Sequence, residues 1–287
     1  MRVLNLSKQK MKCNGEVREV DRIRIKKFNE AKARGEHFPF VPMTFMSIGT
    51  RCMLSCPVQQ RIISLLSRGE RRLYMDLIFS PDIVSVKEQY PLDYVKTQEI
   101  ADTERYIHPR DHETGQLRVM TTDFVVERRA LDNSIYREAL GFKSSLDSEG
   151  GQQTKQQVTR IKQKLTIEKL YWKAFGITYR PILGIHLDKV RLDNYFVLSE
   201  RYQKDIPTKQ LIEFTYKFLS AIANFPRNNL RQCLMVTAHS LDVSPRYLYT
   251  LFCTAVLRHI LQLDLSRPLD FVGEVVLKEN FESSLCS

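Results

Sequence analysis

The sequence is short of the features that mark several protein classes. Among 287 residues there are only 11 glycines and 11 prolines, too few for a linker-rich or collagen-like chain. No apolar run approaches the roughly 20 residues that a membrane helix needs. The amino-terminal stretch MRVLNLSKQKMK has no apolar core of signal-peptide length. We therefore expect a cytoplasmic protein with no membrane partner.

Common metal-binding, nucleotide-binding and hydrolase motifs are also missing. There is no Walker-type GxxxxGK, no GxGxxG after a strand, no HExxH and no GxSxG. The six cysteines are scattered, which argues against a disulfide framework. Cys52 and Cys56 form a C-x3-C pair, but no second pair completes four zinc ligands. A loop explains His108 and His112 more simply than a metal site does.

Basic residues are what the chain has in excess. It contains 44 Lys and Arg against 33 Asp and Glu, which gives a formal net charge of +11 and a pI near 9.4. Eleven of the basic residues and only five acids fall within residues 1–40. Such a charge favours polyanions, and nucleic acid is the leading partner. We expect this arm and the basic helix over 156–175 to contact phosphates, the simpler alternative being a solvated arm.

Hydrophobic periodicity divides the chain into two parts. Residues 1–186 alternate between strand and helix patterns, which indicates an α/β fold with a mixed sheet flanked by helices. Residues 187–287 are mostly helical, with a helix start at Ser244-Pro245 and a potential strand over 271–277. A winged-helix-like domain and a plain helical bundle both fit this second part. The predicted strands cover 83–90, 117–126, 135–142 and 177–185, and the predicted helices include 20–33, 58–79 and 156–175.

One predicted helix carries a glutamate on its apolar stripe. Within 58–79, Glu70 lies four residues after Leu66 and three before Leu73. A carboxylate on a core-facing stripe is costly unless it is paired or binds a cation. The alternative is that Glu70 lies at the edge of the stripe and reaches water or a basic neighbour.

One predicted strand carries an acid although apolar residues occupy both of its faces. Asp123 lies in RVMTTDFVVER, with Val125 on its own face and Phe124 on the other. In a hairpin that turns at 131–134, Asp123 and Lys143 pair near the same end of adjacent strands. The alternative is a plain cross-strand salt bridge.

Together, Glu70, Asp123 and Lys143 form a set that metal-dependent phosphodiesterases need. Two acids hold a hard divalent cation, which neutralises phosphate and lowers the pKa of a bound water. The lysine orients that water or stabilises the developing charge. The backbone carbonyl of Phe142 is a candidate for a further metal ligand. The set is only moderately specific, since acids and lysines are abundant.

Several stretches of the chain resemble the TnsA family, the endonuclease subunits of heteromeric cut-and-paste transposases. The resemblance runs from about residue 22 to about residue 190, and its most specific pieces are VKEQYPL, TTDF and IEKLYWKAFGI, in that order. It implies a restriction-endonuclease-like domain that uses Mg²⁺, which Mn²⁺ can replace. By position, the catalytic glutamate, aspartate and lysine of the family fall on Glu70, Asp123 and Lys143.

The same resemblance implies an activity and partners. The activity is hydrolysis of the phosphodiester at the 5′ ends of the transposon during cut-and-paste transposition. The implied partners are transposon-end DNA, a DDE-type recombinase subunit (TnsB-like) and an AAA+ ATPase regulator (TnsC-like), which the carboxy-terminal domain contacts. The active protein is then associated with the nucleoid. Two alternatives stay open: a stand-alone nuclease of the same fold, and a non-catalytic DNA-binding adaptor of the transposition complex.

The chain departs from the family pattern at three positions. Gly141 stands where the family often has Gln or Glu two residues before the lysine, which puts the number of metals in doubt. Ser144 replaces the usual proline after the lysine, and Gly69 precedes the glutamate inside the helix pattern. Glu168 is expected to be an exposed helix charge, with a supporting acid near the metal as the alternative.

Overall fold

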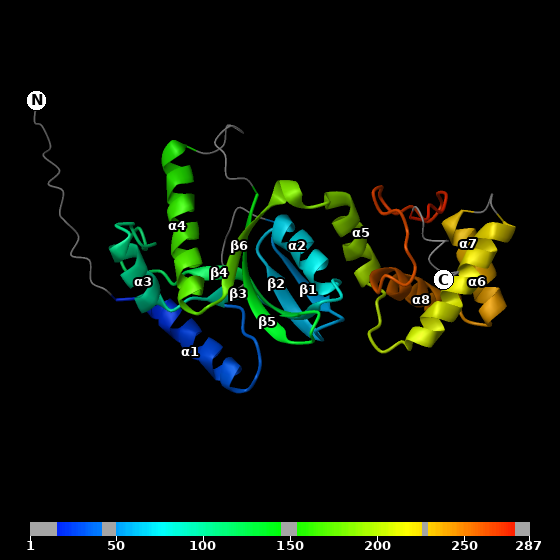
Figure 1. The fold of residues 1–287 in the computed structure, drawn as a ribbon, viewed down its shortest axis with the longest axis horizontal. Coiled ribbons are helices and arrows are strands. Elements are labelled where there is room, and N and C mark those ends of the chain that lie inside the picture. Colours follow the sequence, from blue (N-terminus) through cyan, green and yellow to red (C-terminus); the bar gives the residue numbers. More distant parts are fainter. Residues whose placement is uncertain (1–15, 42–49, 145–153, 226–228, 279–287) are drawn as a thin grey trace, which may run out of the picture.

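The computed structural model describes residues 16–41, 50–144, 154–225 and 229–278. Its centre is a four-stranded sheet in the order β3-β4-β5-β6 (Figure 1). The first three strands are antiparallel and β6 runs parallel to β5, so the predicted mixed sheet is confirmed. The strands are β3 (Ile83–Pro91), β4 (Thr121–Arg129), β5 (Ile135–Lys143) and β6 (Thr178–Leu183).

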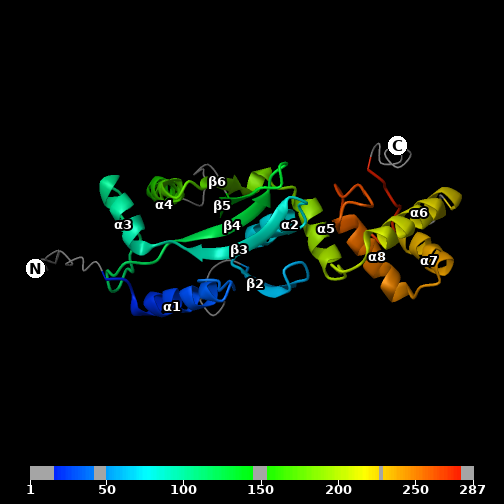
Figure 2. The ribbon, with the colours of Figure 1, turned by 60° about the horizontal axis from the view of Figure 1, so that its bottom comes forward.

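Helices cover the two faces of this sheet. On one face α2 (Arg68–Ile78) packs its apolar side onto the sheet through Tyr74, which meets Phe124 of β4. On the other face α4 (Lys155–Ala174) contributes Ile167 and Trp172 to a second apolar cluster. In Figure 2, α4 lies on one side of the sheet, and α1 (Glu19–Ala33) with the β1–β2 hairpin lies on the other. A polar stretch that gave no helix signal forms α3 (Tyr94–Thr103), which is capped by Asp93.

The helix predicted over 58–79 is wrong in its first half. That half contains strand β2 (Arg61–Leu65), which forms an antiparallel hairpin with the preceding β1 (Cys52–Cys56). The turn between them includes Gln60 at φ 52°. Arg61 donates to Glu88 Oε2 at 2.6 Å and to the Val86 carbonyl at 2.7 Å. These contacts join the hairpin to β3, so a tertiary interaction overrides the local helical spacing.

The carboxy-terminal part is helical, as predicted. Figure 1 shows α5 between the sheet and the three helices at the far end. The strand predicted over 271–277 is wrong, because only an isolated bridge joins Leu263 to Leu277. The proposed boundary near residue 187 stays a prediction. The helices are α5 (Lys189–Ser199), α6 (Thr208–Asn224), α7 (Leu230–Leu241) and α8 (Pro245–Leu257).

The polar contacts between α2 and α5 centre on Asp193. Its carboxylate accepts hydrogen bonds from Arg72 at 2.6 Å, Arg71 at 3.0 Å and Arg68 at 3.1 Å. These arginines flank Glu70, so α5 helps to hold the helix that carries it. In the part of the chain that the structure describes, no helix is long and apolar enough to cross a membrane.

Candidate active site

Glu70 is held at the start of α2 by the residues just before it. Ser67 is the helix cap, and its hydroxyl accepts from the Glu70 amide while donating to Glu70 Oε1, both at 3.1 Å. The Leu66 amide donates to Oε2 at 3.0 Å. Only 7% of the residue is exposed. Burial and the nearby charge of Asp123 raise the pKa of Glu70 to about 7, which is the behaviour of a buried acid close to a second carboxylate.

Asp123 lies where the sheet separates between β4 and β5. The pairing of these strands ends at Phe124 with Leu140. Beyond that point β4 stays paired with β3 as far as Thr121, and β5 stays paired with β6 as far as Lys143. A buried amide freed by such a separation needs a new acceptor. Asp123 Oδ2 provides it, because the Phe142 amide donates to it at 2.7 Å.

Lys143 completes the cluster from the end of β5. Its ammonium lies 3.5 Å from Asp123 Oδ2 and donates to the Phe142 carbonyl at 2.8 Å. The expected ion pair is therefore present. The strand register differs from the predicted one, because it sets Asp123 level with Gly141 rather than with Lys143.

Lys143 remains a cation despite its surroundings. Burial alone would lower its pKa, but the carboxylates of Asp123 and Glu168 outweigh this effect, and the net pKa is raised. A protonated lysine beside two acids can stabilise negative charge that develops on a phosphate.

Glu168 is buried, which corrects the expectation of an exposed helix charge. Only 6% of the residue is exposed, and its carboxylate accepts from the Thr122 hydroxyl at 3.3 Å. Thr122 in turn accepts from the Trp172 indole at 2.8 Å. Burial is the largest cause that raises the pKa of Glu168 to about 7, and Lys143 opposes it. The acid therefore belongs to the same electrostatic cluster as Asp123 and Lys143.

Gln89 is a site residue that the sequence reasoning did not single out. It is 1% exposed, and its amide donates to Glu70 Oε2 at 3.1 Å. Its backbone is left-handed, at φ 49°. This breaks the strand alternation, because Val86 packs on the α2 face while Tyr90, four residues on, meets Trp172 of α4. Strained positions in the middle of a strand are typical of functional sites.

Two departures from the family pattern have a steric reason. A Cβ at Gly69 would overlap the ring of Phe142, and one at Gly141 would overlap the hydroxyl of Tyr179. Glycine therefore lets α2 and β6 approach β5 closely on both sides of that strand. The Tyr179 hydroxyl and Glu168 occupy the neighbourhood of Gly141, where the family often places a longer polar side chain. Ser144 is exposed, and nothing in the structure explains its replacement of proline.

The donor atoms fit a magnesium ion that draws its other ligands from water and DNA. Mg²⁺ is usually held by one or two carboxylates together with substrate phosphates. Glu70 and Asp123 supply two carboxylates, and no described residue hydrogen-bonds to Asp123 Oδ1. The Phe142 carbonyl accepts from Lys143 but keeps a second lone pair. Within the described ranges no group of three or more His, Cys, Asp or Glu side chains is placed to hold a metal alone.

Part of the chain is similar to a known protein family. Residues 80–183 match the family described as TnsA-like endonuclease N terminal. The matched segment contains Gln89, Asp123, Lys143 and Glu168, while Glu70 lies shortly before it and is joined to it by the hydrogen bond from Gln89. No curated protein matches the chain.

Proposed function

We propose that this chain, whose residues 80–183 match the TnsA-like endonuclease family, is the Mg²⁺-dependent endonuclease subunit of a heteromeric transposase. Its reaction would be hydrolysis of the phosphodiester at the 5′ ends of the transposon, leaving a 5′-phosphate and a 3′-hydroxyl. The observation that carries the proposal is the meeting of Glu70, Asp123 and Lys143 where β4 and β5 separate. Mn²⁺ is expected to substitute for Mg²⁺.

Each residue has a definite task in this proposal. Glu70 and Asp123 would hold the ion, with the Phe142 carbonyl as a third protein ligand. When bound, Mg²⁺ supplies charge neutralisation of the phosphate and a water of lowered pKa. Lys143 orients the attacking water and stabilises charge on the phosphate oxygens. Gln89 fixes the rotamer of Glu70, since its amide and the Leu66 amide donate to the same oxygen.

Glu168 of α4 supports Lys143 electrostatically. The two are close enough for each to shift the pKa of the other. A lysine that is attracted by Asp123 and Glu168 together is confined to the space between them. We infer that Glu168 positions the ammonium group and does not touch the DNA.

The proposed partners follow from the family. A DDE-type recombinase would cut and join the other strand, and an AAA+ ATPase would contact the helical part that begins at α5. Base recognition would come mainly from the recombinase. The contacts of this chain with DNA would then be to phosphates, which position DNA without specifying sequence.

The proposal is tested by mapping nicks on end-labelled transposon-end DNA. The full chain is incubated with the recombinase and ATPase, with Mg²⁺, with Mn²⁺ or with EDTA. We expect nicks at the 5′ ends with either metal, none with EDTA, and none when the recombinase is omitted. Cutting by the chain alone would favour a stand-alone nuclease. No 5′ nick under any condition, with DNA and partners still bound, would favour an adaptor.

A further inference from the structure

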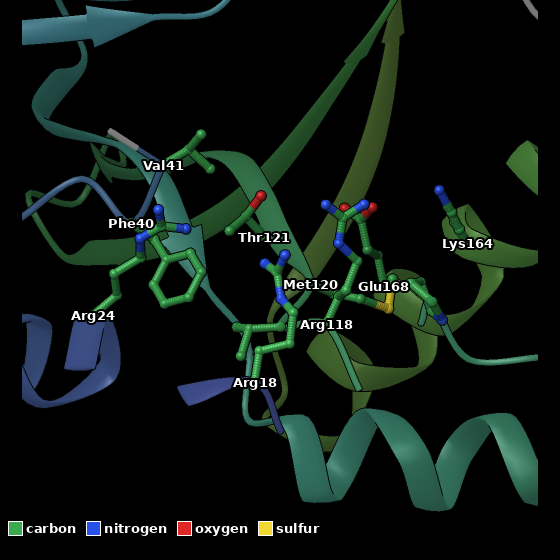
Figure 3. A pocket seen from close by; sticks show the side chains of 11 residues that line it. Arg18, Arg24, Phe40, Val41, Arg118, Met120, Thr121, Lys164 and Glu168 are labelled. Atoms are coloured by element: carbon green, nitrogen blue, oxygen red, sulfur yellow. The ribbon is translucent and has the colours of Figure 1, made fainter. Parts of the chain in front are cut away.

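A pocket of about 290 Å³ adjoins the catalytic cluster and is lined by basic side chains from three separate segments (Figure 3). Arg18 and Arg24 come from the start of α1, Arg118 from the segment before β4, and Lys164 from α4. Glu168 also lines it, and this residue connects the pocket to Lys143. Part of the predicted basic arm and part of the basic helix therefore meet at one place.

The two arginines from the arm are fixed before any ligand arrives. Asp21 is fully buried and accepts three hydrogen bonds from Arg18 at 2.9–3.0 Å and one from Arg24 at 3.4 Å. The backbone of the arm is joined to the strand side of the pocket, because the Arg18 amide donates to the Leu117 carbonyl at 3.2 Å. The positions of these guanidinium groups are thus set by the fold.

The other two cations are not neutralised in this way. The side chains of Arg118 and Lys164 form no hydrogen bond or ion pair with any residue that the structure describes. Crowding by protein atoms lowers the pKa of Lys164, as do the nearby charges of Arg160, Lys143 and Arg118. Mutually repelling cations beside apolar walls such as Phe40 and Met120 are stabilised when an anion enters between them.

We propose that this pocket binds one backbone phosphate of the DNA strand, next to the phosphate that is cut, with Arg118 and Lys164 as its principal contacts. The inference rests on the proposed endonuclease function. Arg18 and Arg24 add N–H donors at fixed positions, although Asp21 and Asp111 offset much of their charge, and the Thr121 hydroxyl is available as a neutral donor. Because Glu168 both lines this pocket and interacts with Lys143, a phosphate held here sets the position of the adjoining scissile phosphate.

The test is the salt dependence of DNA binding without metal, so that no cutting occurs. Fluorescence anisotropy with labelled transposon-end duplex in EDTA compares wild type with the double variant Arg118→Gln, Lys164→Gln over a series of KCl concentrations. Losing one phosphate contact should reduce the slope of log K against log[salt] by about 0.9. The matched control is Lys209→Gln, Lys217→Gln, which removes the same charge from exposed positions of α6 outside the pocket and should leave the slope unchanged.

A second measurement localises the contact. Duplexes that carry a single neutral methylphosphonate, moved one position at a time past the cut site, should include one that weakens binding of wild type but not of the double variant. Arg118→Lys, which keeps the charge, should retain the wild-type slope and shows that the site is folded. Equal slopes for wild type and the double variant would overturn the proposal, as would an equal loss in the control.

These results are separable from the endonuclease proposal. If the slope changes as expected but Mg²⁺ gives no nicks, the pocket is a DNA site of a protein that does not cut. If nicks form normally and the slope does not change, the pocket assignment fails and the endonuclease stands. If inorganic phosphate binds the pocket but the double variant leaves the salt slope of DNA binding unchanged, the pocket is a site for a free anion, and this result would also overturn the proposal.

Discussion

Gly141 offers a quantitative test of how the site is built. A Cβ at this position overlaps the hydroxyl oxygen of Tyr179, and the next nearest atom is the ring carbon Cζ at 3.1 Å. The Gly141→Ala variant must therefore displace a buried tyrosine. Overpacking of this kind costs about 2 kcal/mol within a usual range of about 1–3. At roughly 2–4 °C per kcal/mol, the expected fall in Tm is about 4–8 °C.

The source of that cost is checked by removing the obstructing atom. The Tyr179 hydroxyl is buried and has the Glu168 carboxylate as its polar neighbour, but no described atom lies in good hydrogen-bond geometry with it, so Tyr179→Phe alone should cost no more than about 1 kcal/mol. In the double variant the nearest atom becomes Cζ at 3.1 Å, a tight contact that a small shift relieves. In urea unfolding, the double variant should regain more than half of the free energy of unfolding that Gly141→Ala loses, with a coupling energy of about 1 kcal/mol or more between the two positions. Additive effects of the two substitutions would refute this account of why the chain has glycine here.

Three further predictions concern neighbouring parts of the molecule. Gln89→Leu removes a donor to Glu70 without altering backbone preference. It should slow nicking about tenfold, which corresponds to about 1.4 kcal/mol in activation free energy, and leave Tm nearly unchanged. An unaltered nicking rate would mean that the amide does not position Glu70. Burial lowers the pKa of His108, so unfolded chains bind more protons than folded ones below about pH 6.5. The contribution of His108 to the free energy of unfolding should therefore be full above that pH and fall as the pH decreases. Urea titrations of His108→Gln should show a weaker pH dependence than wild type, and equal pH dependence would contradict the prediction. Asp193→Asn removes the negative charge that Arg68, Arg71 and Arg72 share, and one of its two acceptor oxygens, and should lower the free energy of unfolding by about 1–2 kcal/mol. No change in the urea midpoint would show that α5 does not brace α2.

Sequence periodicity was sufficient for most of the sheet and for the long helices. Strands over 83–90 and 135–142 and the helix over 156–175 differ from the observed elements by a residue or so. The segment before Glu70 was misjudged because its contacts are distant in sequence. Arg61 pairs with Glu88, and only the folded sheet brings the two together. The polar helix α3 has little apolar periodicity and gave no signal of its own.

Two of the three proposed catalytic positions could be argued from burial alone. Glu70 and Asp123 lie among apolar residues, so the free-energy cost of burying each carboxylate has to be offset by a charged partner or a bound ion. The same reasoning, applied to α4, would have found Glu168, because it lies on one stripe with Leu165 and Trp172. Gln89 was beyond this approach, since its importance depends on a left-handed backbone and on a hydrogen bond to another element.

The central claim is that the acids and the lysine at the separation of β4 and β5 perform the cut. The direct measurement is 5′-end nicking by Asp123→Asn beside wild type, with Mg²⁺, labelled transposon-end DNA, the recombinase and the ATPase. Asparagine keeps the shape and the acceptor for the Phe142 amide but removes the charge. We predict at least about a 100-fold loss of nicking, as expected when a charge-stabilising group is removed, with DNA and partner binding retained. Nicking at the wild-type rate would contradict the account and would make Asp123 and Lys143 a structural ion pair.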